Sequence, residues 1–124
     1  MTKRILVVDD EPDISEVVKK ALSLYGFEVD AYNDAEEALS KFDVGRYELL
    51  LLDYKLPNMT GFELYKRMKE KDDKVKACFL TGADTTYLEE AKNEQITDIN
   101  PKCYVQKPVR MDVLAKQLNQ ILEG

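Results

Sequence analysis

The stretch ILVVDDEPD, Ile5 to Asp13, combines two features that decide the fold. Four aliphatic residues in succession are typical of a strand that is buried on both faces of a sheet. They lead directly into Asp9 and Asp10, with Glu11 close behind. Adjacent carboxylates repel one another, so either solvent screens these charges or a cation binds among them.

Short apolar runs recur along the chain and alternate with longer stretches of helical spacing. The runs are Ile5–Val8, Phe27–Tyr32, Leu49–Leu52, Ala77–Leu80 and Cys103–Val105. Strands that alternate with helices predict right-handed βαβ crossovers and a parallel sheet covered on both faces. The four successive leucines suit a central strand. The sequence therefore predicts one α/β domain, a doubly wound (βα)5 sandwich that spans residues 1–124.

Capping residues mark the ends of the predicted helices. The helices are expected to begin near Ile14, Asp34, Thr60, Thr86 and Met111. Thr60 and Thr86 are each followed three residues later by a glutamate, which is the spacing of a capping box. Gly26 is a C-terminal stop for the first helix. Glu11 and Asp13, on either side of Pro12, are expected to interact with the positive N-terminal end of that helix.

Composition narrows the function classes. The net charge of −6, from 18 basic and 24 acidic residues, argues against a nucleic-acid-binding surface. No apolar run approaches the roughly 18 residues of a membrane span, and no signal peptide is evident, so a cytoplasmic protein without membrane contact is expected. The absence of histidine excludes a histidine-based catalytic triad and a histidine-ligated zinc site. Cys78 and Cys103 lie in apolar segments and are expected to be reduced and buried.

Polar residues follow most of the predicted strands. They are Asp9 and Asp10 after the first, Asp53 after the third, Thr81 after the fourth and Lys107 after the fifth, and the second strand contributes nothing obvious. Each alone could simply cap the helix that follows. Together they would meet at the carboxyl edge of the sheet, where ligands bind in open parallel sheets. Three carboxylates suit Mg²⁺, and with a hydroxyl and an ammonium they suit a phosphoryl group and a carboxylate nucleophile.

The motifs VVDDEP, LLLLDYKLPNMTG, FLTG and VQKP, in this order, resemble the receiver domain of two-component response regulators, of the single-domain chemotaxis-regulator type. The resemblance covers essentially the whole chain and implies a flavodoxin-like sheet of order 2-1-3-4-5. It implies that Asp53 accepts a phosphoryl group from a phosphohistidine of a sensor histidine kinase or a histidine phosphotransfer protein. It also implies Mg²⁺, with Mn²⁺ as an alternative, bound by Asp10, Asp53 and the backbone carbonyl of Lys55, with Asp9 acting largely through water.

The same resemblance implies how the signal is expressed. Thr81 would hydrogen-bond the phosphoryl oxygens, Lys107 would pair with them, and Tyr104 would be the switch aromatic. Phosphorylation replaces one negative charge by nearly two and adds acceptors, so it can reverse the populations of two conformations. The responding surface would comprise the fourth helix, fifth strand and fifth helix, where an unknown downstream protein or a second copy of the chain would bind. No enzymatic activity is expected beyond self-phosphorylation and autodephosphorylation.

Three other functions are weighed. A haloacid-dehalogenase-type phosphatase needs a second aspartate two residues after its nucleophile, where this chain has Lys55. A flavodoxin-like binder needs a first loop that cradles phosphate, which Asp9, Asp10 and Glu11 would repel. A phosphorylation-independent receiver that acts as an interaction or dimerisation module typically lacks one of the acidic, threonine or lysine positions, and all five are present here.

Some features depart from the family pattern. Thr81 and Lys107 are 107 − 81 = 26 positions apart, several more than expected. The extra residues, in KNEQITDINPKCYVQKP, predict either an unusual loop or helix beside the responding surface or a neutral insertion. Ala83 offers no polar group that would position an attacking water, and Lys55 could shield the phosphoryl group or draw it away from productive geometry, so slow autodephosphorylation is expected. No output segment follows Gly124 in this sequence, and both a stand-alone protein and a domain of a longer one stay open.

Overall fold

A parallel β-sheet forms the centre of the protein. The computed structural model describes residues 3–81, 104–106 and 110–123, without the side chains of residues 81, 104, 106 and 123. The strands are β1 (Arg4–Val8), β2 (Glu28–Tyr32), β3 (Leu49–Asp53), β4 (Lys76–Thr81) and β5 (Tyr104–Gln106). They pair in parallel in the order β2-β1-β3-β4-β5. The predicted strand order is confirmed.

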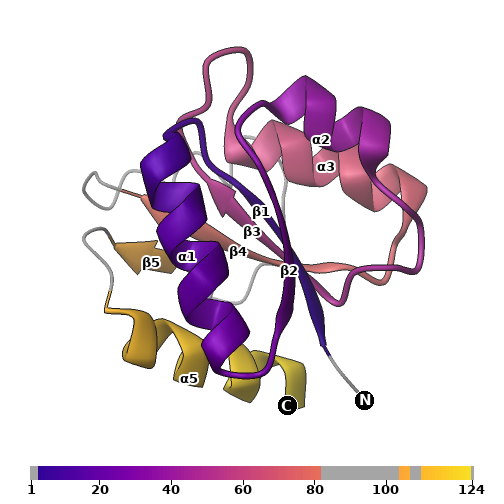
Figure 1. Cartoon of the computed structure of the whole chain (residues 1–124). Coiled ribbons are helices and arrows are strands. Elements are labelled where there is room, and N and C mark those ends of the chain that lie inside the picture. Colours follow the sequence, from indigo (N-terminus) through magenta and orange to yellow (C-terminus); the bar gives the residue numbers. More distant parts are fainter. Residues whose placement is uncertain (1–2, 82–103, 107–109, 124) are drawn as a thin grey trace.

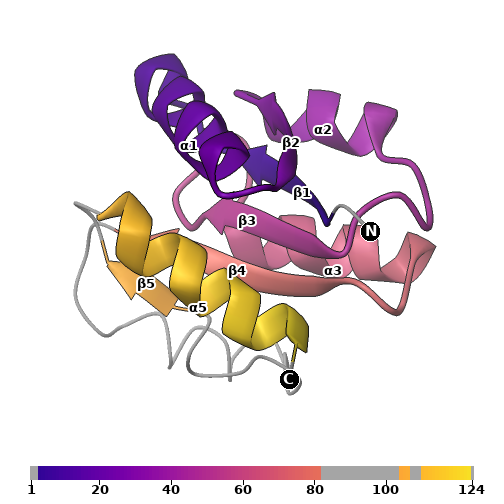
Figure 2. The same ribbon diagram turned by 60° about the horizontal axis from the view of Figure 1, so that its bottom comes forward.

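Helices cover both faces of this sheet. They are α1 (Pro12–Leu24), α2 (Ala35–Lys41), α3 (Gly61–Lys71) and α5 (Met111–Glu123). α1 and α5 lie on one face, and α2 and α3 lie on the other (Figures 1 and 2). The helix predicted near Thr86 falls outside the described residues. Within the described part of the chain, no helix is long and apolar enough to cross a membrane.

The predicted capping residues begin two of the helices. The Asp34 carboxylate accepts a hydrogen bond from the Glu37 amide at 3.0 Å, and the Thr60 hydroxyl accepts one from the Glu63 amide at 3.1 Å. These bonds satisfy amides that have no partner within the helix. α1 begins differently, with Pro12 as its first residue and no side-chain cap from Glu11. Its start therefore depends on the preset backbone angle of proline.

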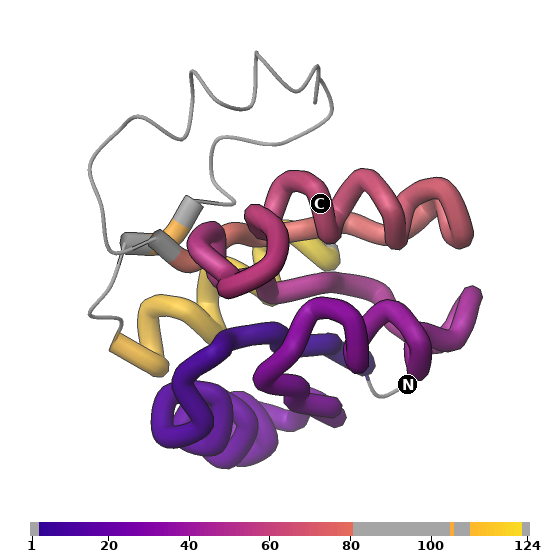
Figure 3. Tube along the Cα trace, turned by 90° about the horizontal axis from the view of Figure 1, so that it is seen from above, coloured from indigo at the N-terminus to yellow at the C-terminus, as the bar shows by residue number. Residues whose placement is uncertain are grey.

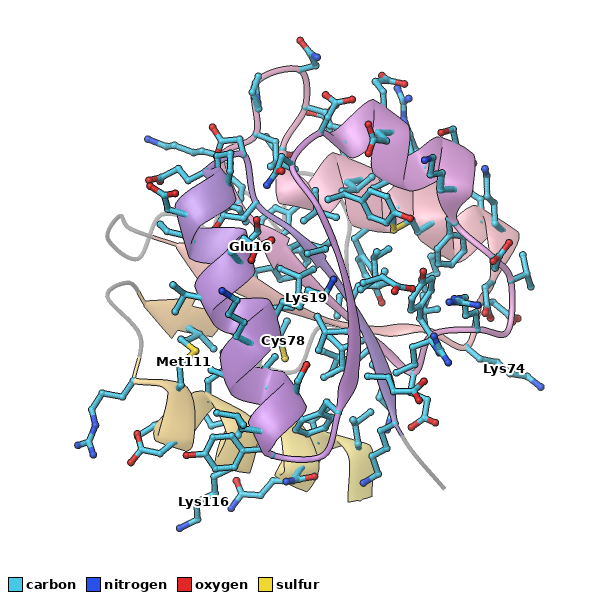
Figure 4. The ribbon with its side chains drawn as sticks, in the orientation of Figure 1. Glu16, Lys19, Lys74, Cys78, Met111 and Lys116 are labelled. Atoms are coloured by element: carbon cyan, nitrogen blue, oxygen red, sulfur yellow. The ribbon has the colours of Figure 1, made fainter. Side chains whose placement is uncertain are left out.

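Alternate residues of β1, β3 and β4 enter two separate hydrophobic cores. Leu50 and Leu52 of β3 pack with α2 and α3, and Leu49 and Leu51 pack with α1 and α5. All five residues of β3 are buried, as predicted for a central strand. Cys78 of β4 is buried in the core between the sheet and the α1–α5 layer (Figure 4), as predicted, and Cys103 lies outside the described residues.

Strand ends differ by a residue from those predicted. β2 begins at Glu28 and excludes Phe27, and β5 includes Gln106, one residue beyond the predicted run. β3 and β4 each extend one residue further, so that Asp53 and Thr81 are the last residues of their strands. The apolar runs underestimate the length of these two strands because the final residue of each strand is polar. That extension is important for the site, because the backbone of Asp53 belongs to the sheet itself.

Candidate functional site

Three carboxylates gather at the carboxyl edge of the sheet. Asp9 and Asp10 follow β1 directly, and Asp53 ends the neighbouring strand β3. One carboxylate oxygen from each residue lies within 4.8 Å of the others. Asp9 is fully buried, Asp53 is 6% exposed and Asp10 is exposed. The connections from β1 to α1 and from β3 to α3 lie at the same end of the sheet (Figure 3), so sheet pairing alone brings these residues together.

This acidic cluster has the chemistry of a divalent-cation site. Two buried carboxylates beside a third repel one another strongly, because the protein interior screens charge less than water does. Hard oxygen donors at this spacing are the ligands that Mg²⁺, Mn²⁺ and Ca²⁺ prefer. The donor set therefore fits a hard divalent cation, and a bound cation would relieve the repulsion.

Hydrogen bonds to residues of the described segments hold the loop that carries Asp9. The Asp9 amide donates to the Tyr32 carbonyl at 3.1 Å, which extends the pairing of β1 with β2 by one residue. The Asp9 carboxylate accepts from the Glu11 amide at 3.0 Å. The Asp9 carbonyl accepts from the side chain of Asn33 at 2.9 Å. Asp9 is thus fixed through its amide, its carbonyl and its carboxylate.

Asn33 corrects one prediction. The sequence indicated nothing obvious after the second strand, yet Asn33 follows β2 directly and contacts the backbone of the acidic loop. The signal was present in the sequence, because a side-chain amide at the carboxyl edge of a parallel sheet can reach the loops that follow neighbouring strands. The prediction considered charged and hydroxyl residues after each apolar run. It overlooked Asn33 because asparagine carries no charge.

The loop between β3 and α3 is folded tightly over the end of β3. The Tyr54 amide donates to Leu80 of β4 at 2.8 Å, and the Gly61 amide donates to the Tyr54 carbonyl at 2.7 Å. Lys55 and Thr60 form an isolated antiparallel bridge that closes the loop. A Cβ atom on Gly61 would lie only 2.6 Å from the backbone oxygen of Asp53. Glycine is therefore required for α3 to begin this close to the acidic cluster.

Aromatic rings pack beneath this loop. The Tyr54 and Phe62 ring centroids are 5.1 Å apart, those of Phe62 and Phe79 are 4.7 Å apart, and Tyr65 packs edge-on against Phe79. Edge-to-face aromatic pairs at these separations stabilise beyond their buried area. They connect the residue that follows Asp53 to both α3 and β4, and so restrict the loop beside the acidic cluster.

The remaining predicted site residues lie at or beyond the ends of β4 and β5. Asp53 pairs with Leu80, so the backbone of Thr81 is one residue further along β4, and Thr81 pairs with Gln106. The backbone of Tyr104 pairs with Phe79. The side chains of Thr81 and Tyr104, and all of Ala83 and Lys107, lie outside the described residues. The backbone register nevertheless brings the ends of β3, β4 and β5 to one edge.

A comparison with protein families identifies this arrangement. The family model described as the response regulator receiver domain matches residues 5–119. The chain belongs to this family. A receiver domain is a phosphoacceptor module of two-component signal transduction, modified on an aspartate, and it is not an enzyme in its own right. The acidic cluster is therefore the pocket of a receiver for phosphorylation-dependent signalling, and a histidine kinase is the partner that such a system implies.

Curated relatives agree with this assignment. The chain is 33% identical over 121 residues to the transcriptional regulatory protein TrcR of Mycobacterium tuberculosis, covering 96% of this chain and 45% of that protein. It is 33% identical to the regulatory protein VanRB of Enterococcus faecalis, covering 98% and 53%. The sensor protein EvgS of Escherichia coli matches at 32% identity over 9% of its own length. The receiver thus spans about half or less of these relatives.

Solved structures of receiver domains share this fold. A CheY-like receiver domain from Methanospirillum hungatei has a TM-score of 0.84 at 30% identity, with 99% of this chain and 95% of that chain covered. The response regulator TrrA of Thermotoga maritima, in complex with Mg²⁺ and beryllofluoride, has a TM-score of 0.78 at 34% identity, with 97% and 99% covered. These neighbours identify the described strands and helices as the flavodoxin-like fold of a receiver.

Proposed function

We propose that this receiver accepts a phosphoryl group on Asp53 from the phosphohistidine of a sensor histidine kinase or a histidine phosphotransfer protein, with Mg²⁺ bound at the acidic cluster. The observation that carries the proposal is the place of Asp53, which ends the central strand with its carboxylate beside those of Asp9 and Asp10. The family match over residues 5–119 also supports one receiver domain over residues 1–124.

The transfer exchanges one bond to phosphorus for another. A carboxylate oxygen of Asp53 bonds to phosphorus, and the phosphorus–nitrogen bond of the phosphohistidine breaks, which releases the imidazole to the partner. The Asp53 carboxylate is itself the nucleophile. The other residues of the site therefore have to position the phosphoryl donor and to offset the negative charge of the phosphoryl group and the carboxylates. Because the nucleophile is a carboxylate oxygen and not a hydroxyl, the step does not require a general base.

The acidic residues divide the binding of the cation. Asp10 and Asp53, with the Lys55 backbone carbonyl, would bind Mg²⁺ or Mn²⁺ directly, and Asp9 would act largely through water. Support for the indirect role of Asp9 comes from its carboxylate, which already accepts the Glu11 amide. When bound, the cation neutralises charge on the phosphoryl oxygens.

The response would begin at the ends of β4 and β5. Thr81 would hydrogen-bond the phosphoryl oxygens, Lys107 would pair with them, and Tyr104 would move with Thr81. Support comes from the register, which pairs Thr81 with Gln106, the residue before Lys107. The surface that responds would comprise β5, α5 and the segment between β4 and β5, and it would bind a downstream protein or a second copy of the chain.

The test is phosphorylation by a small donor. The wild type, incubated with acetyl phosphate and Mg²⁺, is expected to gain the mass of one phosphoryl group, and Asp53→Asn is expected to gain none. Asp13→Asn is the matched control, because it makes the same change in charge in the first turn of α1 but outside the acidic cluster. It is expected to behave like the wild type, and chelation of Mg²⁺ should prevent labelling in both.

Two results would contradict the proposal. Labelling of Asp53→Asn at the wild-type rate would move the acceptor to another residue. A wild type that is not labelled, and whose NMR spectrum does not respond to beryllofluoride with Mg²⁺, would instead support the phosphorylation-independent interaction module.

A further inference from the structure

The loop between β2 and α2 is joined to the acidic loop by Asn33. Its side-chain nitrogen carries two hydrogens. One points to the Asp9 carbonyl at 2.9 Å and the other to the Ser15 hydroxyl at 2.8 Å. The Ser15 hydroxyl in turn donates to the Pro12 carbonyl at 3.0 Å. One side chain thus connects the end of β2 to the end of β1 and to the first turn of α1.

The bond to the Asp9 carbonyl acts on Asp10. That carbonyl belongs to the peptide unit that joins Asp9 to Asp10, and this unit is planar. A hydrogen bond that fixes the direction of the Asp9 carbonyl therefore also fixes the orientation of the Asp10 amide in the same plane. Asp10 is the exposed member of the acidic cluster, so it gains little restriction from packing. Asn33 supplies a restriction that burial does not.

We propose that Asn33 is a positioning residue of the cation site, which sets the affinity for Mg²⁺ by fixing the peptide unit between Asp9 and Asp10. The inference rests on the proposed function of Asp9, Asp10 and Asp53. Ser15 contributes by holding the second hydrogen of the Asn33 amide, which leaves the first one directed at Asp9. Groups that orient ligands through hydrogen bonds commonly change metal affinity without touching the metal.

A role in packing alone is a poor explanation for these contacts. The Asn33 side chain is exposed, so its truncation removes no buried apolar group. Its neighbour Asp34 provides the contrast, because Asp34 caps α2 through the Glu37 amide. The two adjacent residues thus separate the two roles, with Asn33 directed to the acidic loop and Asp34 to helix stability.

The experiment compares Mg²⁺ affinity with stability in the full chain. Isothermal titration with Mg²⁺ is expected to show a Kd for Asn33→Ala about ten-fold above that of the wild type. Asp34→Ala should lower the thermal midpoint because the cap is lost, yet keep the Kd within about two-fold. Asp34→Ser, which retains a capping oxygen, separates the loss of the cap from the loss of charge. Exchange of the Glu11 amide, bonded to Asp9, should accelerate in Asn33→Ala only.

The outcomes separate this inference from the function on which it rests. If Asn33→Ala binds Mg²⁺ as tightly as the wild type while Asp53→Asn loses binding, the positioning role is wrong and the cation site stands. Equal weakening in Asn33→Ala and Asp34→Ala would also overturn it, because loss of stability would then explain both. A wild type that binds no Mg²⁺ would overturn the cation site and the positioning role together.

Discussion

Two polar clusters on the same sheet have opposite electrostatics. In the acidic cluster, Asp9, Asp10 and Asp53 bring three like charges together. In a second group, which we call the paired cluster, Asp30 of β2 accepts hydrogen bonds from Tyr47 at 2.7 Å and from Arg46 at 3.3 Å. The paired cluster is neutralised by its own residues, and the acidic cluster has the donor set of a divalent-cation site. We expect the first arrangement to contribute to stability and the second to serve function.

The paired cluster shifts the protonation of its members. Burial alone raises the pKa of the Asp30 carboxyl, but the hydrogen bonds from Tyr47 and Arg46 outweigh it and lower that pKa. Burial, and then the hydrogen bond to the Asp30 carboxylate, raises the pKa of Tyr47 to about 12. Both shifts favour the states that bond to each other, a neutral tyrosine and an ionised aspartate. The cluster is therefore strongest near neutral pH.

The largest effect is expected at Gly61, beside the acidic cluster. The Cβ of Gly61→Ala would lie 2.6 Å from the Asp53 backbone oxygen, so α3 or the end of β3 has to move. We expect a loss of about 1–3 kcal/mol in the free energy of unfolding, by analogy with overpacked cores. Urea denaturation measures this loss, and Mg²⁺ titration should show weaker binding as well.

Gly26→Ala is the matched control for that change. Gly26 ends α1 with φ of +92°, and an added Cβ would contact nothing within 4 Å. The alanine would be strained by the backbone angle, at about 1–2 kcal/mol, far from the carboxylates. Stability should fall while Mg²⁺ affinity is retained. An unchanged Mg²⁺ affinity in Gly61→Ala would mean that the position of Asp53 tolerates displacement.

The next effect concerns pH and tests the paired cluster. The unfolded tyrosine titrates near 10 and the folded Tyr47 near 12, so the folded state holds its proton longer. The stabilisation is complete below pH 10 and is lost as the pH rises through 12, by up to about 2 kcal/mol. Tyr47→Phe should remove this loss between pH 10 and 12. A stability curve that falls equally in both proteins over that range would show that other groups are responsible.

Asp30 gives the corresponding dependence at the acidic end of the pH range. Its folded pKa is lowered, so its contribution is present above the unfolded value of about 3.8 and is lost as the pH falls through the folded pKa. Because Asp30 is in part exposed, this contribution is smaller than that of a buried carboxylate.

The smallest effect tests the comparison most directly, because the two clusters should respond with opposite signs. Asp10→Asn removes a like charge and should raise stability without Mg²⁺ on the order of 1 kcal/mol. Asp30→Asn removes a paired charge and should lower stability by about 1 kcal/mol. Urea denaturation in the presence of a chelator measures the two changes in stability.

The same comparison can be made with Mg²⁺ added. The wild type should then gain stability, and Asp10→Asn should gain less. Destabilisation of the metal-free protein by Asp10→Asn would show that repulsion in the acidic cluster is already relieved.

Much of the fold could be predicted because burial and turn chemistry agree along the chain. Leu49–Leu52 suits a strand with both faces covered, which the structure confirms, and Asp34 and Thr60 begin their helices as expected. The acidic cluster was also predictable, since the parallel order of β1 and β3 brings the residues after them together. These conclusions need only local patterns and one rule about parallel sheets.

The contacts between loops could not be predicted in the same way. Asn33 reaches Asp9 across 24 positions of sequence, and the Gly45 amide donates to Asp72 across 27. Both depend on the distance between loops, which follows from strand register and not from the loops' own residues. The close approach of Gly61 to Asp53 is of this kind too. The sequence places a glycine at position 61, but the clash that an added Cβ would make with Asp53 depends on the three-dimensional packing of α3 against β3.

The position of β3 has a practical consequence for measurement. This strand is hydrogen-bonded to β1 on one side and β4 on the other, and all its residues are buried. Its amides should exchange with solvent only when the whole domain opens. They therefore provide an internal reference for hydrogen-exchange experiments. A change of exchange in the surrounding loops after modification, with β3 unchanged, can be assigned to local rearrangement and not to altered global stability.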